Sequence, residues 1–145
     1  MTRYVFGGDG GDKLTGGAQA DDLRVGNGRD VLHGEGGVDM LVGGQDDDIL
    51  KGGWAGDHLS GGQGDDLLIG GGADVFVFGQ NSGTDTMQDF ADGKDLLQIA
   101  DHIGDFAALV IADDSADLKI IHDGGVVLLL GQAGTTPTSV DFDFG

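Results

Sequence analysis

The sequence predicts an all-β fold, a flattened parallel solenoid with two walls and 18 residues in each right-handed turn. Three observations predict it. From Gly7 onward, seven units of nine residues follow one another without a break, as in GGDGGDKLT and GGQGDDLLI. Each of these units has Asp at position 6 and Leu at position 8. Glycine dominates positions 1, 2 and 4, where it supplies the positive φ angles that tight turns need.

The fixed phase of Asp and Leu argues against a flexible glycine-rich linker, which would show the glycines alone. Positions 7 to 9 are interpreted as a short strand with only position 8 pointing inward. One inward Leu per unit cannot bury itself, so alternate units are expected to stack as opposite walls. The inward ladders are Leu14, Leu32, Leu50 and Leu68 on one wall, and Leu23, Leu41, Leu59 and Phe76 on the other.

The repeat weakens toward the C-terminus. The unit GGGADVFVF is one residue short before Asp74, and residues 80–88 and 90–98 keep only Gly, Asp and an apolar residue in phase. We therefore expect a solenoid over 1–98, with strong repeats at 7–78 and a degenerate turn at 80–98. Residues 99–145 are expected to form a C-terminal β cap, including a hairpin that turns at residues 123–125.

Apolar residues also occupy the outward positions 7 and 9 of several units. We expect the C-terminal segment to pack on these walls and on the end of the solenoid. Dimerisation through an uncovered wall is the alternative, so the chain is expected to be a monomer or a weak dimer.

The composition excludes several classes of protein. The formal charge is −19, and all but Glu35 of the 26 acidic residues are Asp. Such a surface repels nucleic acid and anionic lipid, and it attracts cations. The chain has no Cys, no apolar run long enough for a membrane span and no apolar N-terminal signal core.

Stacking places the position 6 carboxylates in two columns, one on each edge of the solenoid. Carboxylates on strands about 4.8 Å apart repel by roughly 3–4 kcal/mol at an effective dielectric constant of 20. A hard divalent cation between successive turns reverses this sign. Carboxylate and carbonyl oxygens without Cys or clustered His favour calcium over zinc or copper, and magnesium demands a stricter octahedron.

Eight aspartates in two columns leave six gaps, and Asp85 and Asp95 of the degenerate turn would raise the number to eight. Six calcium ions would bring the formal charge from −19 to −7. The candidate metal-binding residues are Asp12, Asp21, Asp30, Asp39, Asp48, Asp57, Asp66, Asp74, Asp85 and Asp95, with Gly7, Gly8, Gly10, Gly16, Gly17, Gly26, Gly28, Gly34, Gly37, Gly43, Gly44, Gly52, Gly53, Gly61, Gly62, Gly64, Gly70 and Gly71. Weaker sites are expected where other residues replace glycine, at Gln19, Val25, Glu35, Asp46 and Ala55.

The units resemble the nonapeptide G-G-x-G-x-D-x-U-x of RTX (repeats-in-toxin) proteins, over residues 7–78 strongly and more loosely beyond. The resemblance implies the β-roll fold, calcium between the loops and a C-terminal cap like that of secreted bacterial proteases, lipases, haemolysins and alginate epimerases. The final SVDFDFG is similar to the tail of type I secretion substrates, although a buried last strand explains the same residues.

Two functions from different classes remain. The first is a non-catalytic module that folds on binding calcium outside the cell and supports type I secretion. The second is a polysaccharide-binding module attached to a secreted enzyme, similar to the repeat modules of alginate epimerases. Its possible stacking residue is Trp54, at position 3 of its unit. No catalytic constellation stands out in the sequence, so the chain itself is not expected to be an enzyme.

Overall fold

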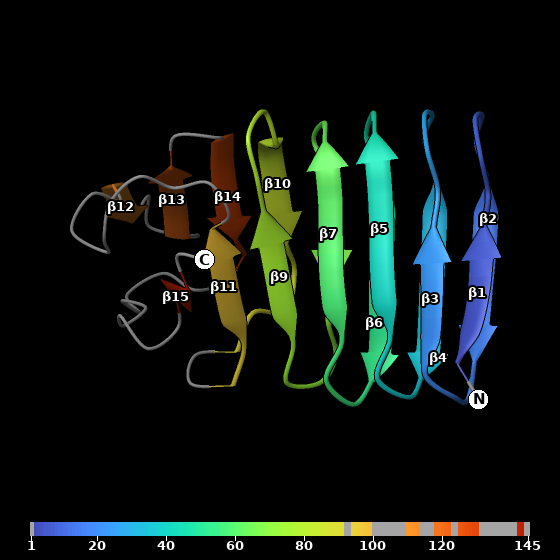
Figure 1. The fold of residues 1–145 in the computed structure, drawn as a ribbon. Coiled ribbons are helices and arrows are strands. Elements are labelled where there is room, and N and C mark those ends of the chain that lie inside the picture. The colour runs from blue at the N-terminus through green and yellow to red at the C-terminus, as the bar shows by residue number, and fades with distance from the viewer. Residues whose placement is uncertain are drawn as a thin grey trace.

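A computed structural model describes residues 2–91, 94–99, 110–113, 118–122, 125–130 and 142–143. Within these residues the protein is all-β and contains no helix. Two parallel sheets form a β-solenoid of about 5 turns with about 18 residues per turn, as predicted. Figure 1 shows the strands stacked along the solenoid from β1 and β2 at one end to β11 and β14 toward the other.

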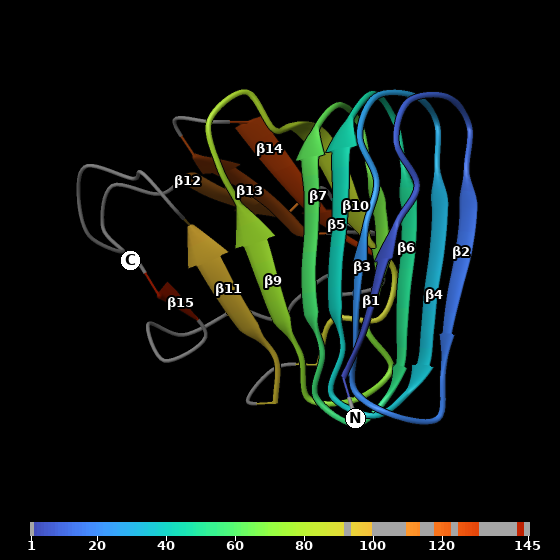
Figure 2. The same cartoon turned by 45° about the vertical axis from the view of Figure 1, so that its right-hand side comes forward.

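The chain alternates between the two sheets (Figure 2). One sheet contains, in spatial order, β1 (Arg3–Phe6), β3 (Asp21–Arg24), β5 (Met40–Gln45), β7 (His58–Gln63), β9 (Val75–Phe78), β11 (Leu96–Ile99) and β15 (Phe142–Asp143). The other contains β2 (Lys13–Gly17), β4 (Val31–Gly36), β6 (Ile49–Trp54), β8 (Leu67–Ile69), β10 (Gly83–Met87), β14 (Gly125–Leu129), β13 (Leu118–His122) and β12 (Val110–Asp113).

The register of the sheets reproduces the predicted ladders. Leu14 pairs with Leu32, Leu32 with Leu50 and Leu50 with Leu68. In the other sheet Leu23, Leu41, Leu59 and Phe76 align in the same way. All of these side chains except Leu14 are completely buried, and Leu14 packs against the cluster from the N-terminal coil.

Several strands are longer than expected. The sequence suggested strands at positions 7 to 9 only, whereas β4, β5, β6 and β7 each span six residues. The extension arises because glycine positions of the next unit also pair across coils, as Gly44 does with Gly62. Glycine has no side chain to hinder this close backbone approach, so the turns shrink to a few residues at each edge.

The degenerate units continue both sheets. Thr86 and Met87 of β10 pair with Leu67 and Leu68, and β11 pairs with β9 over four residues. Met87, Phe90, Leu97 and Ile99 extend the buried core into this coil.

The C-terminal hairpin forms, but it does not cover the walls. Strands β13 and β14 are antiparallel, with His122 opposite Gly125, which confirms a hairpin at the expected place. However, β14 pairs in parallel with β10 and so extends the sheet at its edge. The expectation that the C-terminal segment covers the end of the solenoid is thus confirmed for this hairpin, whereas the expected packing on the outward faces is not seen for it, because its backbone groups pair with the sheet edge. Outward Val31, Ile49 and Leu67 are half-buried without it.

Some expectations fall on residues outside those described. They include the hairpin turn at 123–124, residues 100–109 and the tail at 139–145 apart from β15. In the described part of the chain, no helix has the length and apolar character needed to cross a bilayer.

Candidate metal centres

The position 6 aspartates lie where each turn ends and the next strand begins. In both columns, the backbone N–H of one aspartate donates to Oδ1 of the aspartate one coil further on. Asp30 N donates to Asp48 Oδ1 at 2.8 Å, and Asp39 N donates to Asp57 Oδ1 at 2.8 Å. The same bond joins Asp12 to Asp30, Asp21 to Asp39, Asp48 to Asp66, Asp57 to Asp74, Asp66 to Asp85 and Asp74 to Asp95.

The second carboxylate oxygen of most of these residues is buried and has no hydrogen-bond partner. The orphaned atoms are Oδ2 of Asp12, Asp30, Asp39, Asp48, Asp57 and Asp66. Asp39 and Asp48 are 1% exposed and Asp57 is 0% exposed. A buried unpaired carboxylate oxygen is costly, so this arrangement requires a cation or a proton at Oδ2.

Beside the glycine at position 1, a carbonyl oxygen of the next coil lies close to Oδ2 of the aspartate. We call the space between these two oxygens and the glycine a cradle. A Cβ atom on Gly52 would lie 2.5 Å from Asp57 Oδ2 and 2.9 Å from the Gly70 carbonyl oxygen. On Gly16 it would lie 2.6 Å from Asp21 Oδ2 and 2.8 Å from the Gly34 oxygen. Gly34 and Gly43 have the same two kinds of neighbour, from Asp39 and Gly52 and from Asp48 and Gly61. Each of these cradles thus combines a carboxylate and a carbonyl oxygen in a space that a side chain would fill.

The glycines at positions 2 and 4 shape the turns. Gly44 and Gly62 at position 2 have φ of 116° and 112°, and Gly64 at position 4 has φ of 133°. Three of the residues that replace glycine adopt the same backbone, with φ of 80° at Glu35, 73° at Asp46 and 91° at Ala55. Such conformations cost non-glycine residues about 1–3 kcal/mol each. Gln19 and Val25 are not among the residues with positive φ.

Burial raises the pKa of the column carboxyls. It raises the pKa of Asp48 to about 7, of Asp57 and Asp66 to about 6, and of Asp85 to about 8. Burial likewise raises the pKa of Asp39, Asp74 and Asp95. The hydrogen bonds from backbone N–H groups act in the opposite direction and are outweighed, so the charged form is disfavoured until a cation is near.

The donor set suits a hard cation. Among the described residues, no three or more His, Cys, Asp or Glu side chains converge on a single point. Each cradle instead offers one carboxylate oxygen per coil together with backbone carbonyls. Oxygen ligands with irregular geometry fit calcium, which accepts six to eight of them, better than zinc or copper.

Two predicted sites depart from this arrangement. Near Asp12, a Cβ on Gly7 would meet Asp12 Oδ2 and Val25 Cγ1, each at 2.7 Å, so a methyl group borders this cradle. At the other end, Asp74 Oδ2 already accepts a hydrogen bond from Gly72 N at 2.9 Å.

Sequence reasoning missed Asp89. Its Oδ1 accepts a hydrogen bond from Gly70 N at 2.9 Å, and its charge contributes to the raised pKa of both Asp74 and Asp95, after burial. The residue lies between the two degenerate units, outside the nine-residue phase. Its only signal was its position two residues beyond β10, the strand that continues the Leu68 ladder.

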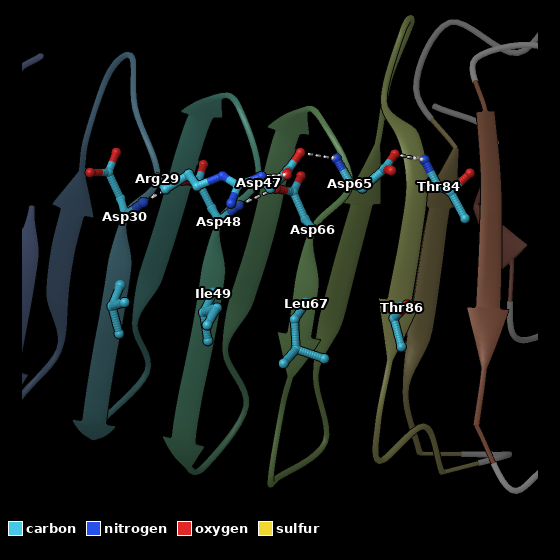
Figure 3. A pocket seen from close by; sticks show the side chains of 11 residues that line it. Arg29, Asp30, Asp47, Asp48, Ile49, Asp65, Asp66, Leu67, Thr84 and Thr86 are labelled. Carbon is cyan, nitrogen blue, oxygen red and sulfur yellow. Dashed lines mark hydrogen bonds and ion pairs between the residues drawn. The ribbon is translucent and has the colours of Figure 1, made fainter. Parts of the chain in front are cut away.

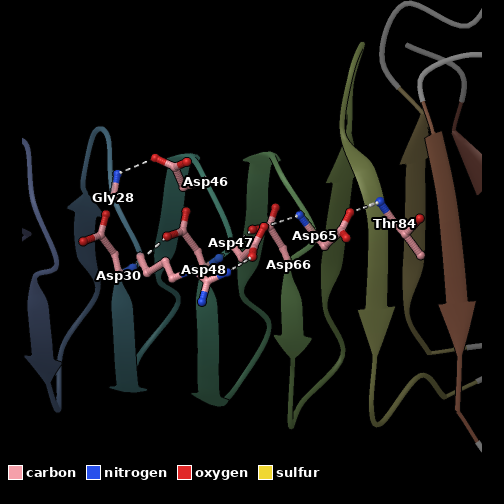
Figure 4. Close-up of polar contacts among 9 residues, drawn as sticks. Gly28, Asp30, Asp46, Asp47, Asp48, Asp65, Asp66 and Thr84 are labelled. Carbon is pink, nitrogen blue, oxygen red and sulfur yellow. Dashed lines mark hydrogen bonds and ion pairs between the residues drawn. The ribbon is translucent and has the colours of Figure 1, made fainter.

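A second ladder runs through the turns that lead into β4, β6 and β8 and ends at Thr84 in β10, and it too was missed. Thr84 N donates to Asp65 Oδ1 at 2.8 Å, and Asp65 N donates to Asp47 Oδ1 at 3.1 Å (Figure 4). Arg29 then pairs with Asp47 Oδ2 at 2.5 Å. The bond from Asp65 N is the main reason that the pKa of Asp47 is lowered.

This ladder borders a groove of about 430 Å³, whose lining includes the strand residues Val31, Ile49, Leu67 and Thr86. Figure 3 shows Ile49, Leu67 and Thr86 below the row of carboxylates in that view. Asp47 accepts a bond at Oδ1 and pairs with Arg29 at Oδ2, and Asp65 accepts a bond at Oδ1, so this ladder stabilises the turns. None of its oxygens is among the buried atoms without a partner.

Comparison with known proteins agrees with this geometry. A family model described as the RTX calcium-binding nonapeptide repeat (4 copies) matches residues 4–32 and 15–50. Residues 4–50 thus carry RTX calcium-binding nonapeptide repeats. A second model, the peptidase M10 serralysin C-terminal domain, matches residues 56–119. Both models describe non-catalytic modules typical of secreted proteins, and RTX repeats bind calcium in general.

Two solved structures resemble this chain. The extracellular lipase LipA from Serratia marcescens has a TM-score of 0.50 and 17% identity, covering 98% of this chain and 40% of the lipase. The AlgE6R3 subunit of the Azotobacter vinelandii mannuronan C5-epimerase has a TM-score of 0.39 and 22% identity, covering 96% of this chain and 81% of the subunit. This chain thus corresponds to less than half of the length of the lipase, with which it shares the fold. No curated protein matches it in sequence.

Proposed function

We propose that this chain is a calcium-driven folding module of an exported protein. The observation that carries the proposal is the set of six buried Oδ2 atoms without partners, arranged in two columns on opposite edges of the solenoid. The columns raise the free energy of the folded chain unless their charge is compensated, and the fold contains no Lys or Arg side chain bonded to those atoms among the described residues.

The apolar core alone is thin for a chain of this length. Through most of the coils, each strand contributes one fully buried side chain, such as Leu41 or Leu50. Burying one Leu contributes about 1.5–3 kcal/mol, whereas ordering nine residues of backbone costs roughly 1–2 kcal/mol per residue. Hydrogen bonds between coils add to the balance, but repulsion between the columns subtracts from it.

Bound calcium would neutralise the charge of the columns, and it would fix the turns whose oxygens coordinate it. The chain would hold it through Oδ2 of the position 6 aspartates and through glycine carbonyl oxygens. The turns would position these oxygens around the ion. The ten aspartates and eighteen glycines identified in the sequence are the proposed ligand-bearing residues. The proposed number is about six ions, and at most eight.

Export follows from the same switch. A chain that stays expanded where calcium is scarce, and folds where calcium is plentiful, suits passage through a type I exporter. Support for this comes from the secreted character of RTX and serralysin-type modules. We therefore propose an extracellular location and a role in the secretion and stability of the protein that carries the module.

A calcium titration tests the folding claim. Circular dichroism is expected to show a disordered spectrum in excess chelator and a cooperative gain of β signal as calcium rises. Magnesium at the same concentration is expected to produce much less β signal, because it dehydrates reluctantly and requires strict octahedral geometry. A complete β spectrum in excess chelator at pH 8 would refute the proposal.

One observation favours a second function, the binding of an acidic, alginate-like polysaccharide. Trp54 is 83% exposed, which is unusual for a large aromatic side chain. It borders two hollows on the outer face, one lined by His33, Glu35 and Lys51 and the other by Thr15 and Ala18. An exposed ring beside a cationic side chain is a suitable surface for a carboxylated sugar.

Calorimetry with alginate oligomers in saturating calcium tests this second function. Binding by the native chain that Trp54→Ala weakens tenfold or more would support it, with Tyr4→Ala, another exposed aromatic residue, as the matched control. No heat of binding at millimolar oligomer would exclude it and would leave the folding function unaffected.

A further inference from the structure

The unit that ends the regular repeats has a shorter turn. Three residues separate Gly70 from Asp74, whereas four separate Gly52 from Asp57 and Gly61 from Asp66. The missing residue brings Gly72 N onto Asp74 Oδ2 at 2.9 Å. Asp57, one coil earlier in the same column, has no partner for its Oδ2.

The space beside Asp74 also differs from the other cradles. A Cβ on Gly70 would meet Asp74 Oδ2 and, at 2.9 Å, Cζ of Phe76. On Gly52 the carbonyl oxygen of Gly70, in the next coil, would lie at the same distance of 2.9 Å. An aromatic carbon, which is no ligand for a hard cation, therefore borders the space beside Asp74.

The following coil completes the closure. Asp95 Oδ1 accepts the hydrogen bond from Asp74 N at 2.9 Å, and Asp95 Oδ2 accepts one from Ala91 N at 2.7 Å. Asp89 Oδ1 accepts another from Gly70 N at 2.9 Å. Both carboxylate oxygens of Asp74 and of Asp95 therefore have backbone donors, unlike those of Asp39 and Asp57 in the same column.

We propose that the step from the Asp74 coil to the Asp95 coil is closed by the chain's own amide groups and holds no calcium ion. This inference rests on the proposed function, lowers its upper limit from eight ions to seven, and makes the two edges of the solenoid unequal. The edge containing Asp48 and Asp66 keeps an orphaned oxygen at every coil up to β8, whereas the metal-dependent part of the other edge ends at Asp57. The Asp74 turn is thus a metal-independent closure of its column.

Counting bound calcium in matched variants tests the inference. Asp57→Asn and Asp74→Asn each neutralise one buried position 6 carboxyl of the same column while keeping an Oδ1 acceptor for the backbone bond. Equilibrium dialysis with radioactive calcium, on protein whose β signal in saturating calcium matches the native chain, gives the number of ions per chain. We expect Asp57→Asn to bind at least one ion fewer than the native chain and Asp74→Asn to bind the native number.

The loss of an ion in a folded Asp74→Asn variant would overturn the inference. If that variant does not fold, Asp95→Asn replaces it, because Asp95 closes the same step, and it too is expected to retain the native number. A variant with one glycine inserted after Gly72 restores the full turn and is expected to bind one ion more; a folded insertion variant with the native number would contradict the inference.

The outcomes separate this inference from the proposed function. If the native chain binds no calcium, or if Asp57→Asn loses none, the proposed function or its ligands are wrong. If Asp57→Asn loses an ion and Asp74→Asn loses one as well, only the closure is wrong.

Discussion

The position 6 aspartate performs two tasks with one short side chain. Its Oδ1 accepts a backbone N–H from the preceding coil, and its Oδ2 faces the cradle between coils, as in Asp48 and Asp57. Asn could perform the first task but would offer only one oxygen. Glu carries an additional methylene group, which the cradles beside Gly43 and Gly52 do not leave room for. The nearly exclusive use of Asp follows from these two requirements.

The glycine at position 1 is required by close approach. In Gly52→Ala, the new Cβ would lie 2.5 Å from Asp57 Oδ2 and 2.9 Å from the Gly70 oxygen, so the turn must shift. We expect a loss of about 1–3 kcal/mol of stability in saturating calcium and a higher calcium midpoint for folding. Chemical denaturation and circular dichroism measure the two effects.

Gly79→Ala is the matched control for this substitution. A Cβ at Gly79 has no neighbour within 4 Å, so both measurements are expected to stay close to the native values. Equal effects of the two substitutions would show that the cradle at Gly52 is not a tight site.

At the level of the element, each strand contributes to the core through a single inward position. Leu50 is completely buried between Leu32 and Leu68 of the neighbouring coils, while Ile49 beside it faces outward and is half-buried. Because a solenoid coil contacts only its neighbours, the loss of one ladder side chain weakens two interfaces.

Leu50→Ala is therefore expected to lower the free energy of unfolding by about 2–5 kcal/mol in saturating calcium. Ile49→Ala removes a side chain of the same volume from the same strand and is expected to cost clearly less. Urea denaturation monitored by circular dichroism compares the two. A larger loss for Ile49→Ala would contradict the assignment of the inward face.

For the whole molecule, the charge of the columns couples folding to pH. The folded-state pKa is about 6 for Asp57 and Asp66, about 7 for Asp48 and about 8 for Asp85, all raised by burial above the ordinary value of 3.8. Without calcium, an unfolded chain loses these protons at lower pH than a folded one. The contribution of these carboxyls to the stability of the calcium-free chain is thus fully present below about pH 4 and is lost as the pH rises through about 6 to 8.

The calcium-free chain is accordingly expected to show more β structure at pH 5 than at pH 8. The calcium concentration at the midpoint of folding is expected to fall as the pH rises from 5 to 8, since fewer protons then compete for the carboxylates. Circular dichroism in chelator and calcium titrations at several pH values check both trends. Asp47→Asn serves as a control, because the pKa of Asp47 is lowered and this carboxyl is already ionised at pH 5. A pH-independent calcium midpoint would exclude the column carboxyls as ligands.

The period, the two walls, the inward ladders and the two aspartate columns were predictable from the sequence. A fixed nine-residue phase leaves one side chain per unit that can point inward, and a single inward Leu can be buried only by stacking coils 18 residues apart. The repeat phase alone therefore predicts where residues such as Asp30 and Leu32 lie in the fold. The degenerate coil of Met87 and Leu97 keeps enough of the same phase to be predicted as well.

Other features depended on which atoms meet in three dimensions. The length of the strands, the edge pairing of β14, the bond from Gly72 to Asp74 and the role of Asp89 each depend on contacts between backbone groups far apart in sequence. A repeat pattern specifies side-chain direction but not which amide reaches which carboxylate. One deleted residue before Asp74 changed that pairing, and only the packed coils show that the deletion closes a site.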